Sequence, residues 1–209
     1  MAGIIYILVN SFMPDIFKIG RTERNVEDRI KELDTTSMPA PFQCVYAAEV
    51  NDVVIVEKRI QRIFSDKRIR KNREFFEKVL LQQLIEATKL AEIREVTLKN
   101  DIFNEPSDKE VLEKCSEVEE RKNKWAFKDL RIPVNSILYF SKDDSVTSIV
   151  ADENSNRVIF EGVNMSLSAS ALKALNKIGY TWSSVRGSDY WMYEDETLAT
   201  RRLELESIE

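Results

Sequence analysis

The sequence predicts an α+β protein, in which a small mixed β-sheet covered by helices precedes a second small α+β module. Three apolar runs of strand length, residues 3–10, 16–20 and 42–50, lie among segments with helical periodicity. A polar, strongly charged stretch separates them from further strand-like runs and one amphipathic helix. With 209 residues the chain is long enough for two domains, each with its own core.

The predicted first domain spans residues 1–96, with the element order β-β-α-β-α-α. The run GIIYILVN is apolar on both faces, which indicates a central strand. The segment SFMPD is expected to turn the chain into a return strand at 16–20.

Helices are predicted after the hairpin and after the third strand. Asn25 is expected to cap the first, which places Val26, Ile30 and Leu33 on one face. Asn51-Asp52 opens a second helix that runs to about Phe64. After the short aromatic segment Glu74-Phe75-Phe76, a third helix is expected over residues 78–93.

Residues 97–130 are expected to form a charged linker with a marginal helix at 109–124, and residues 131–209 a second module. This module is predicted to have strands at 132–140 and 147–160, the latter interrupted by a turn at 152–156. Ser168 is expected to cap a helix that stops at Gly179.

The composition excludes several classes of protein. The chain contains no histidine, so His-based triads, His general bases and the usual zinc clusters are excluded. No apolar run approaches the roughly 20 residues that span a bilayer, and no secretory signal is visible, so we expect no membrane partner. Cys44 and Cys115 lack metal-ligand spacing, which predicts free thiols in a reducing, cytoplasmic compartment.

The net charge of −5 is unevenly distributed along the chain, because five of the seven residues in the run 67–73 are cationic. A local basic patch on an otherwise acidic chain is typical of phosphate contacts. The same run also fits an ordinary solvated helix end, so the pattern alone leaves both interpretations open.

Four polar residues occupy apolar positions in four separate predicted elements. Glu57 lies on the apolar stripe of the second helix, and Arg29 faces inward in the first. Tyr6 and Lys18 lie inside the two strands of the hairpin. They could converge on one pocket; alternatively, Glu57 and Arg29 form a structural ion pair with Tyr6 as a core residue.

The first 80 or so residues resemble the GIY-YIG nuclease domain, particularly its phage and fungal branch. The resemblance rests on Ile4-Ile5-Tyr6-Ile7-Leu8, on Lys18-Ile19-Gly20-Arg21-Thr22 and on the helix NVEDRIKEL. It continues in the loop MPAPF, in Val56-Glu57-Lys58 and in Asn72-Arg73-Glu74-Phe75-Phe76. The ordered series over most of the domain makes this resemblance specific.

The resemblance implies a metal-dependent endonuclease that hydrolyses phosphodiester bonds in DNA. Glu57 would hold one hydrated Mg²⁺ or Mn²⁺, and Tyr6 would orient or deprotonate the attacking water. Arg29 would stabilise charge on the phosphate, and Arg21 matches a basic residue of many members. DNA contacts are expected from the basic run and two neighbouring amides: Lys67, Arg68, Arg70, Lys71, Arg73, Asn72 and Gln61.

Two residues depart from the common family pattern. Lys18 replaces the second motif tyrosine; it could contact phosphate or lower the pKa of Tyr6, but it cannot act as a second phenol. Gln61 stands where many relatives have a histidine, and an amide cannot shuttle a proton at neutral pH. The branch commonly carries Lys-Ile-Gly, so Lys18 is a variant of the motif, whereas Gln61 weakens the expectation of efficient catalysis.

The C-terminal region resembles the RAMA module, which accompanies restriction enzymes and DNA methylases. The matching stretches are Ile159-Phe160 before Gly162, residues 166–171, Gly179-Tyr-Thr-Trp182, Trp191 and Leu198-Ala-Thr-Arg201. The resemblance implies recognition of target or modified DNA. Trp182 and Trp191 could stack on a base or could simply form the core of a small domain.

Three functions are therefore weighed. The first is a DNA endonuclease with a target-selecting module, as in phage–host or mobile-element conflict. The second is a DNA-binding protein that no longer cleaves, and the third a protein-interaction factor that uses the acidic linker and tail. One metal site suffices to nick, whereas cutting both strands would need a homodimer or two encounters.

Overall fold

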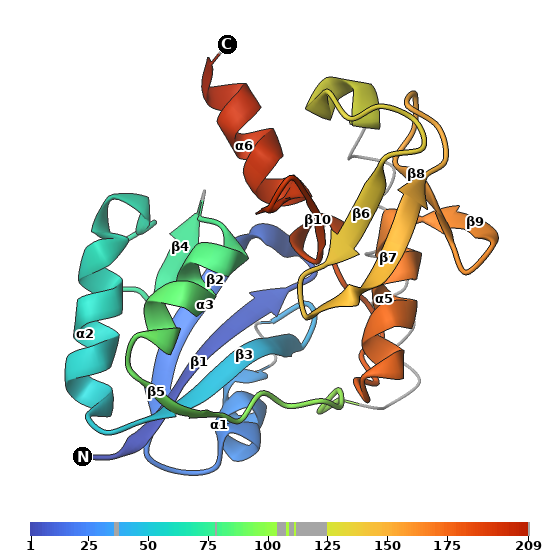
Figure 1. The fold of residues 1–209 in the computed structure, drawn as a ribbon. Helices are drawn as coiled ribbons and strands as arrows, with labels where there is room; N and C mark the ends of the chain where they lie inside the picture. The colour runs from blue at the N-terminus through green and yellow to red at the C-terminus, as the bar shows by residue number, and fades with distance from the viewer. Residues whose placement is uncertain (36–37, 78, 104–107, 109–110, 112–124, 209) are drawn as a thin grey trace. The chain divides into compact units, whose positions relative to one another are not determined.

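The computed structural model describes residues 1–35, 38–77, 79–103, 108, 111 and 125–208. The chain divides into two compact units, Met1–Cys115 and Ser116–Glu209. Each unit contains an antiparallel sheet with helices, which confirms the predicted α+β class (Figure 1). Among the described residues, no helix has the length and apolarity needed to cross a membrane.

The first unit is built on a five-stranded sheet with the strand order β4-β2-β1-β3-β5. Its strands are β1 (Gly3–Asn10), β2 (Met13–Thr22), β3 (Phe42–Val50), β4 (Phe75–Glu77) and β5 (Glu92–Glu95). Its helices are α1 (Val26–Leu33), α2 (Val53–Ile63), the 3₁₀ turn η1 (Ser65–Lys67) and α3 (Leu81–Lys89). The central place of the first strand is confirmed, while the strands expected to form a mixed sheet pair antiparallel throughout.

The sheet of the first unit buries side chains on both faces because helices cover each of them. Ile5 and Ile7 of β1 pack in one cluster with residues of α2 and α3. Tyr6 and Leu8, which alternate with them along the strand, pack in a second cluster with residues of α1. Both helix starts were predicted correctly, since Asn25 and Asp52 accept backbone hydrogen bonds as N-caps of α1 and α2.

Three expectations for this unit need correction. The turn occupies only Ser11–Phe12, where the Asn10 side chain accepts from the Phe12 amide, so Met13, Pro14 and Asp15 belong to β2. The helix expected over 78–93 ends at Lys89, and residues 92–95 form the edge strand β5, because pairing with β3 satisfies their backbone. Position 78 lies outside the described residues.

The segment after β5 packs onto the first unit. The Val96 amide donates to the Ala47 carbonyl at 2.8 Å, and the Ala47 amide donates to the Thr97 hydroxyl at 3.0 Å. Ile102 and Phe103 contact the cluster around Tyr6. The start of the expected linker is therefore ordered against the first unit. The helix expected at 109–124, Val111 apart, and Cys115 lie outside the described residues.

The second unit has a six-stranded sheet with the order β11-β10-β6-β7-β8-β9. Its strands are β6 (Ile137–Phe140), β7 (Asp143–Val150), β8 (Arg157–Phe160), β9 (Val163–Ser166), β10 (Trp191–Tyr193) and β11 (Glu196–Thr197). Its helices are η2 (Phe127–Leu130), α5 (Leu167–Lys177), η3 (Gly187–Asp189) and α6 (Leu198–Ile208).

Two details of the second unit differ from expectation. Ser166, not Ser168, caps α5, and its hydroxyl accepts from the Ala169 amide. The strand expected over 132–140 begins only at Ile137, because Pro133 and the left-handed Asn135 (φ 66°) place a turn before it. The expected hairpin turn between β7 and β8 is confirmed.

The thiol of Cys44 is buried in the first unit and is free, as predicted. Burial raises the pKa of this thiol to about 12, so it stays protonated and unreactive at neutral pH.

Candidate functional site

The pairing of β1 with β2 brings Tyr6 onto Gly20. The strand register sets Tyr6 opposite Gly20 and Leu8 opposite Lys18, so the four side-chain positions share one face of the sheet. A Cβ added to Gly20 would lie 2.5 Å from Tyr6 Oη and 2.6 Å from two ring carbons. Glycine is therefore required at position 20 because the phenol ring lies directly over its Cα.

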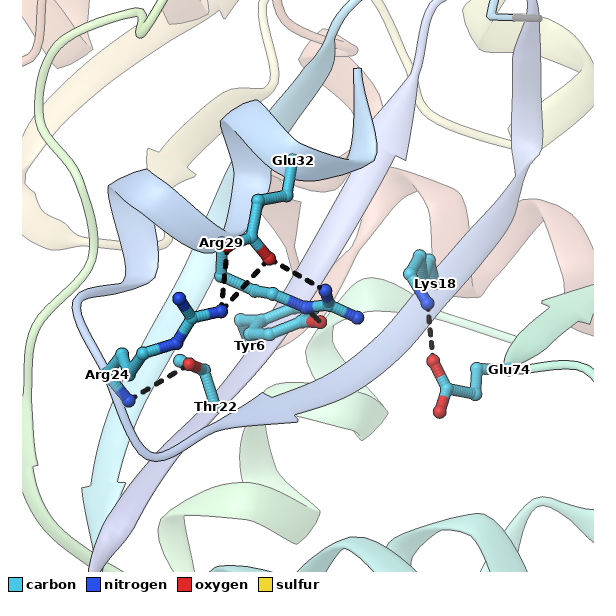
Figure 2. A network of polar contacts seen from close by, with 7 residues as sticks. All are labelled: Tyr6, Lys18, Thr22, Arg24, Arg29, Glu32 and Glu74. Carbon is cyan, nitrogen blue, oxygen red and sulfur yellow. Dashed lines mark hydrogen bonds and ion pairs between the residues drawn. The ribbon is translucent and has the colours of Figure 1, made fainter. Parts of the chain in front are cut away.

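A chain of hydrogen bonds leads from Tyr6 into α1 (Figure 2). Arg29 Nε donates to Tyr6 Oη at 3.4 Å, and Arg29 Nη1 donates to Glu32 Oε2 at 3.0 Å. Arg24 Nη2 donates to both oxygens of Glu32, at 2.7 and 3.1 Å. Glu32 thus lies between two guanidinium groups and holds that of Arg29 near the phenol.

The electrostatics of these contacts keep Tyr6 and Arg29 in their ordinary protonation states. Burial raises the pKa of Tyr6, and the hydrogen bond from Arg29 only partly offsets that effect. The hydrogen bonds to Tyr6 and Glu32 raise the pKa of Arg29. Tyr6 is therefore a neutral hydroxyl at neutral pH, and Arg29 is a cation with 35% of its side chain exposed.

Lys18 can be buried because its charge is balanced by a carboxylate and lies over an aromatic ring. Its residue is 6% exposed, its Nζ lies 2.5 Å from Glu74 Oε2, and it stands 5.4 Å from the centre of the Phe75 ring. Phe75 lies opposite Lys18 in the pairing of β4 with β2. Glu74 directly precedes β4 and points its carboxylate at Lys18 (Figure 2). An effect of Lys18 on the pKa of Tyr6 stays a prediction, while burial, as the largest cause, raises that pKa.

Glu57 lies on the buried face of α2 between Val53 and Ile60, as its spacing predicts. Its Oε2 accepts from Arg21 Nε at 2.9 Å, so the alternative of an ion pair with Arg29 is wrong. Burial and then the charge of Glu74 raise the pKa of Glu57, while Arg21 and Lys18 act in the opposite direction.

Glu57 keeps partial access to solvent beside a second carboxylate. The side chain is 12% exposed and Arg21 is 36% exposed, so the carboxylate is not sealed from solvent. A second nearby carboxylate, Glu74, adds negative charge that a cation would offset. Among the described residues no group of three or more His, Cys, Asp or Glu could hold a metal ion. An ion here would therefore take its remaining ligands from water and phosphate, as Mg²⁺ commonly does.

All residues of the site lie within one region that matches a family model. Residues 3–97 match the T5orf172 domain. This domain is consistent with a nuclease-like, DNA-related function. No curated protein and no solved structure matches the chain. The resemblance of residues 131–209 to the RAMA module stays a prediction.

The basic run 67–73 directly precedes Glu74 of the site, and its members differ in their contacts and exposure. Arg68 Nε donates to the Arg73 carbonyl at 2.5 Å, and its guanidinium lies 5.7 Å from the centre of the Phe76 ring. Lys67 lies 3.5 Å from Asp66. The four residues that follow Ile69 are exposed, namely Arg70, Lys71, Asn72 and Arg73, while Gln61 on α2 is half-buried.

Trp182 and Trp191 are core residues, and their proposed role as stacking faces is wrong. They are 3% and 0% exposed. Trp191 Nε1 donates to the Ser170 hydroxyl at 2.9 Å, and both rings pack edge-on against Tyr190 or Phe140. The alternative interpretation, a small-domain core, is confirmed.

The sequence analysis did not assign three residues to this site: Arg24, Glu32 and Glu74. Glu32 follows Arg29 by three positions in α1, which is the spacing of a helical ion pair and could have indicated it. Arg24 and Glu74 reach their partners only through the loop before α1 and the pairing of β4, which no local pattern encodes.

Proposed function

We propose that the T5orf172 region is a Mg²⁺- or Mn²⁺-dependent endonuclease that hydrolyses phosphodiester bonds in DNA. The observation that carries the proposal is the inward-facing, incompletely buried Glu57, whose pKa is raised by burial and by Glu74. Such a costly carboxylate on a helix face is typical of a functional site. The match to a nuclease-associated domain supports the same conclusion.

The residues of the site fit distinct roles in this reaction. Glu57 would hold the divalent ion, which when bound neutralises the scissile phosphate and stabilises the leaving oxygen. Arg29 would donate to the phosphate as negative charge develops, because Glu32 already fixes its guanidinium. Tyr6 would orient the attacking water through its neutral hydroxyl, since its raised pKa disfavours proton abstraction.

Two cations would complete the site. Arg21 is half-exposed beside Glu57, so it can keep the carboxylate oriented and also reach a phosphate oxygen. Lys18 would contribute positive charge while Glu74 holds it in place. Gln61 has no titratable group with which to shuttle a proton at neutral pH, which predicts slow turnover.

The second unit would select target or modified DNA, as expected in phage–host or mobile-element conflict. Its tryptophans are internal, so selection would depend on its surface. The competing functions, a non-cleaving DNA-binding protein and a protein-interaction factor, differ in measurable behaviour.

The test incubates the full-length protein with supercoiled plasmid, plain or with modified bases, in Mg²⁺, Mn²⁺ or EDTA. We expect cutting with either metal, none in EDTA and none with Glu57→Gln. Glu49→Gln, which removes an exposed carboxylate paired with Arg94, is the matched control and should cut like the parent. Salt-sensitive DNA binding without cutting would support the non-cleaving DNA-binding protein. Absence of DNA binding would support the protein-interaction factor.

A further inference from the structure

The outer face of α2 carries cations that form no ion pair within the described part of the chain. Lys58, Arg59 and Arg62 are exposed, and none forms an ion pair with any residue that the structure describes. The only acid in the helix is Glu57, which faces the core. Lys58 and Arg62 are four residues apart, and like charges at this spacing destabilise a helix by roughly 0.2–0.5 kcal/mol.

The other helices of the first unit show the opposite pattern. In α1, Lys31 lies 2.8 Å from Glu27, and in α3, Lys89 lies 3.1 Å from Glu86. Cations of the sheet and its loops are paired with carboxylates as well: Lys18, Arg21, Arg24 and Arg94. Cations with no ion pair among the described residues of this unit are found between positions 58 and 73.

The cations of α2 continue into the loop that follows it. Backbone hydrogen bonds fold η1 against the end of α2, and the Ile69 amide donates to the Phe75 carbonyl at 3.0 Å, which fixes the loop 68–73 to β4. Arg70, Lys71 and Arg73 in this loop are exposed, and their side chains form no ion pair with any described residue. The helix dipole can account for Arg62 in the last turn but not for Lys58 and Arg59 in the middle of the helix.

We propose that the outer face of α2 and the loop 68–73 form one track for the phosphate backbone of DNA, with Lys58, Arg59 and Arg62 as contacts. This inference rests on the proposed function for its ligand. It explains why like charges are kept together at a cost in helix stability, since bound phosphates would neutralise them. The inner face of the same helix carries Glu57. The helix α2 would therefore carry DNA-backbone contacts on one face and the proposed metal ligand on the other.

The test measures binding of a fluorescent duplex by full-length protein in EDTA, over a series of salt concentrations. The test variant is Lys58→Gln/Arg59→Gln/Arg62→Gln, and the control is Lys31→Gln/Lys89→Gln/Arg94→Gln, which removes three paired cations and the same charge. We expect the slope of log K against log salt to fall by about 2–3 in the test variant, with more than about tenfold weaker binding. The control should keep the parent's slope.

The inference is overturned if the test variant keeps the parent's slope, or if both variants lose slope equally. Should the triple variant fold poorly by circular dichroism, Arg59→Gln and Arg62→Gln are measured singly, each with an expected loss of about 1 in slope. Binding is measured in EDTA, where we expect no cleavage, so an unchanged slope would leave the role of Glu57 untouched. Conversely, Glu57→Gln could cut normally while the track still binds DNA.

Discussion

Replacing Gly20 with alanine should displace the Tyr6 phenol, whose catalytic role is proposed above, without removing any polar group. The added Cβ would lie 2.5 Å from Tyr6 Oη, whereas ordinary contacts begin near 3.4 Å, so the ring must retreat by about 1 Å. Tyr6 is 1% exposed and packs against residues of α1, so a shifted ring would have to displace its neighbours. Overpacking of this kind costs about 1–3 kcal/mol in the free energy of unfolding.

The displacement should also impair the reaction. The Arg29–Tyr6 contact is already 3.4 Å long, and a shift of this size would remove it. Misplacement of a catalytic group by about 1 Å lowers rates by about 10²-fold. We therefore expect Gly20→Ala to lower the melting temperature of the first unit by roughly 5–20 °C and to slow single-turnover plasmid cleavage about a hundredfold.

A double-mutant cycle separates the ring from other causes. In a Tyr6→Val background the ring is absent, so Gly20→Ala should cost at least about 1 kcal/mol less than in the parent. An equal penalty in both backgrounds would refute the reasoning. So would parental stability and cleavage in the single variant.

Three other substitutions test further parts of the account. Because Glu74 raises the pKa of Glu57, and that carboxylate must be ionised to bind a cation, Glu74→Gln should move the acid limb of the pH–rate profile to lower pH; an unmoved limb would count against it. Glu32→Gln should slow cleavage about 10–100-fold with little change in substrate binding, whereas Lys31→Gln beside it should be neutral; equal rates would deny Glu32 its positioning role. Trp191→Phe should lower the free energy of unfolding by about 1–3 kcal/mol, measured by denaturant titration, and leave DNA preference unchanged; an altered preference would revive a base-reading role.

Much of the first unit could be predicted because its local signals agree with its tertiary structure. The strands 3–10 and 42–50 combine β-branched residues with burial, and Asn25 and Asp52 are efficient caps, so their boundaries were predicted almost to the residue. The inward position of Glu57 followed from helical spacing. Its partner did not, because spacing gives the face of a helix but not which strand residue lies across from it.

The failures occurred where pairing between distant segments decides the structure. Residues 92–95 have a helix-compatible sequence, yet they form a strand because their backbone pairs with the edge of β3. Arg24 and Glu74 belong to the site only through loop closure and strand pairing. In the second unit, aromatic residues suggested base stacking, but only the folded core shows that their faces are already covered.

The most direct test of the central claim is Mn²⁺ binding, measured by electron paramagnetic resonance on the full-length protein with a non-cleavable duplex. The account predicts one bound ion in the parent and in Glu74→Gln, and no bound ion in Glu57→Gln at the same concentrations. Equal binding by the parent and Glu57→Gln would contradict it, because the carboxylate at position 57 would then not be the ligand.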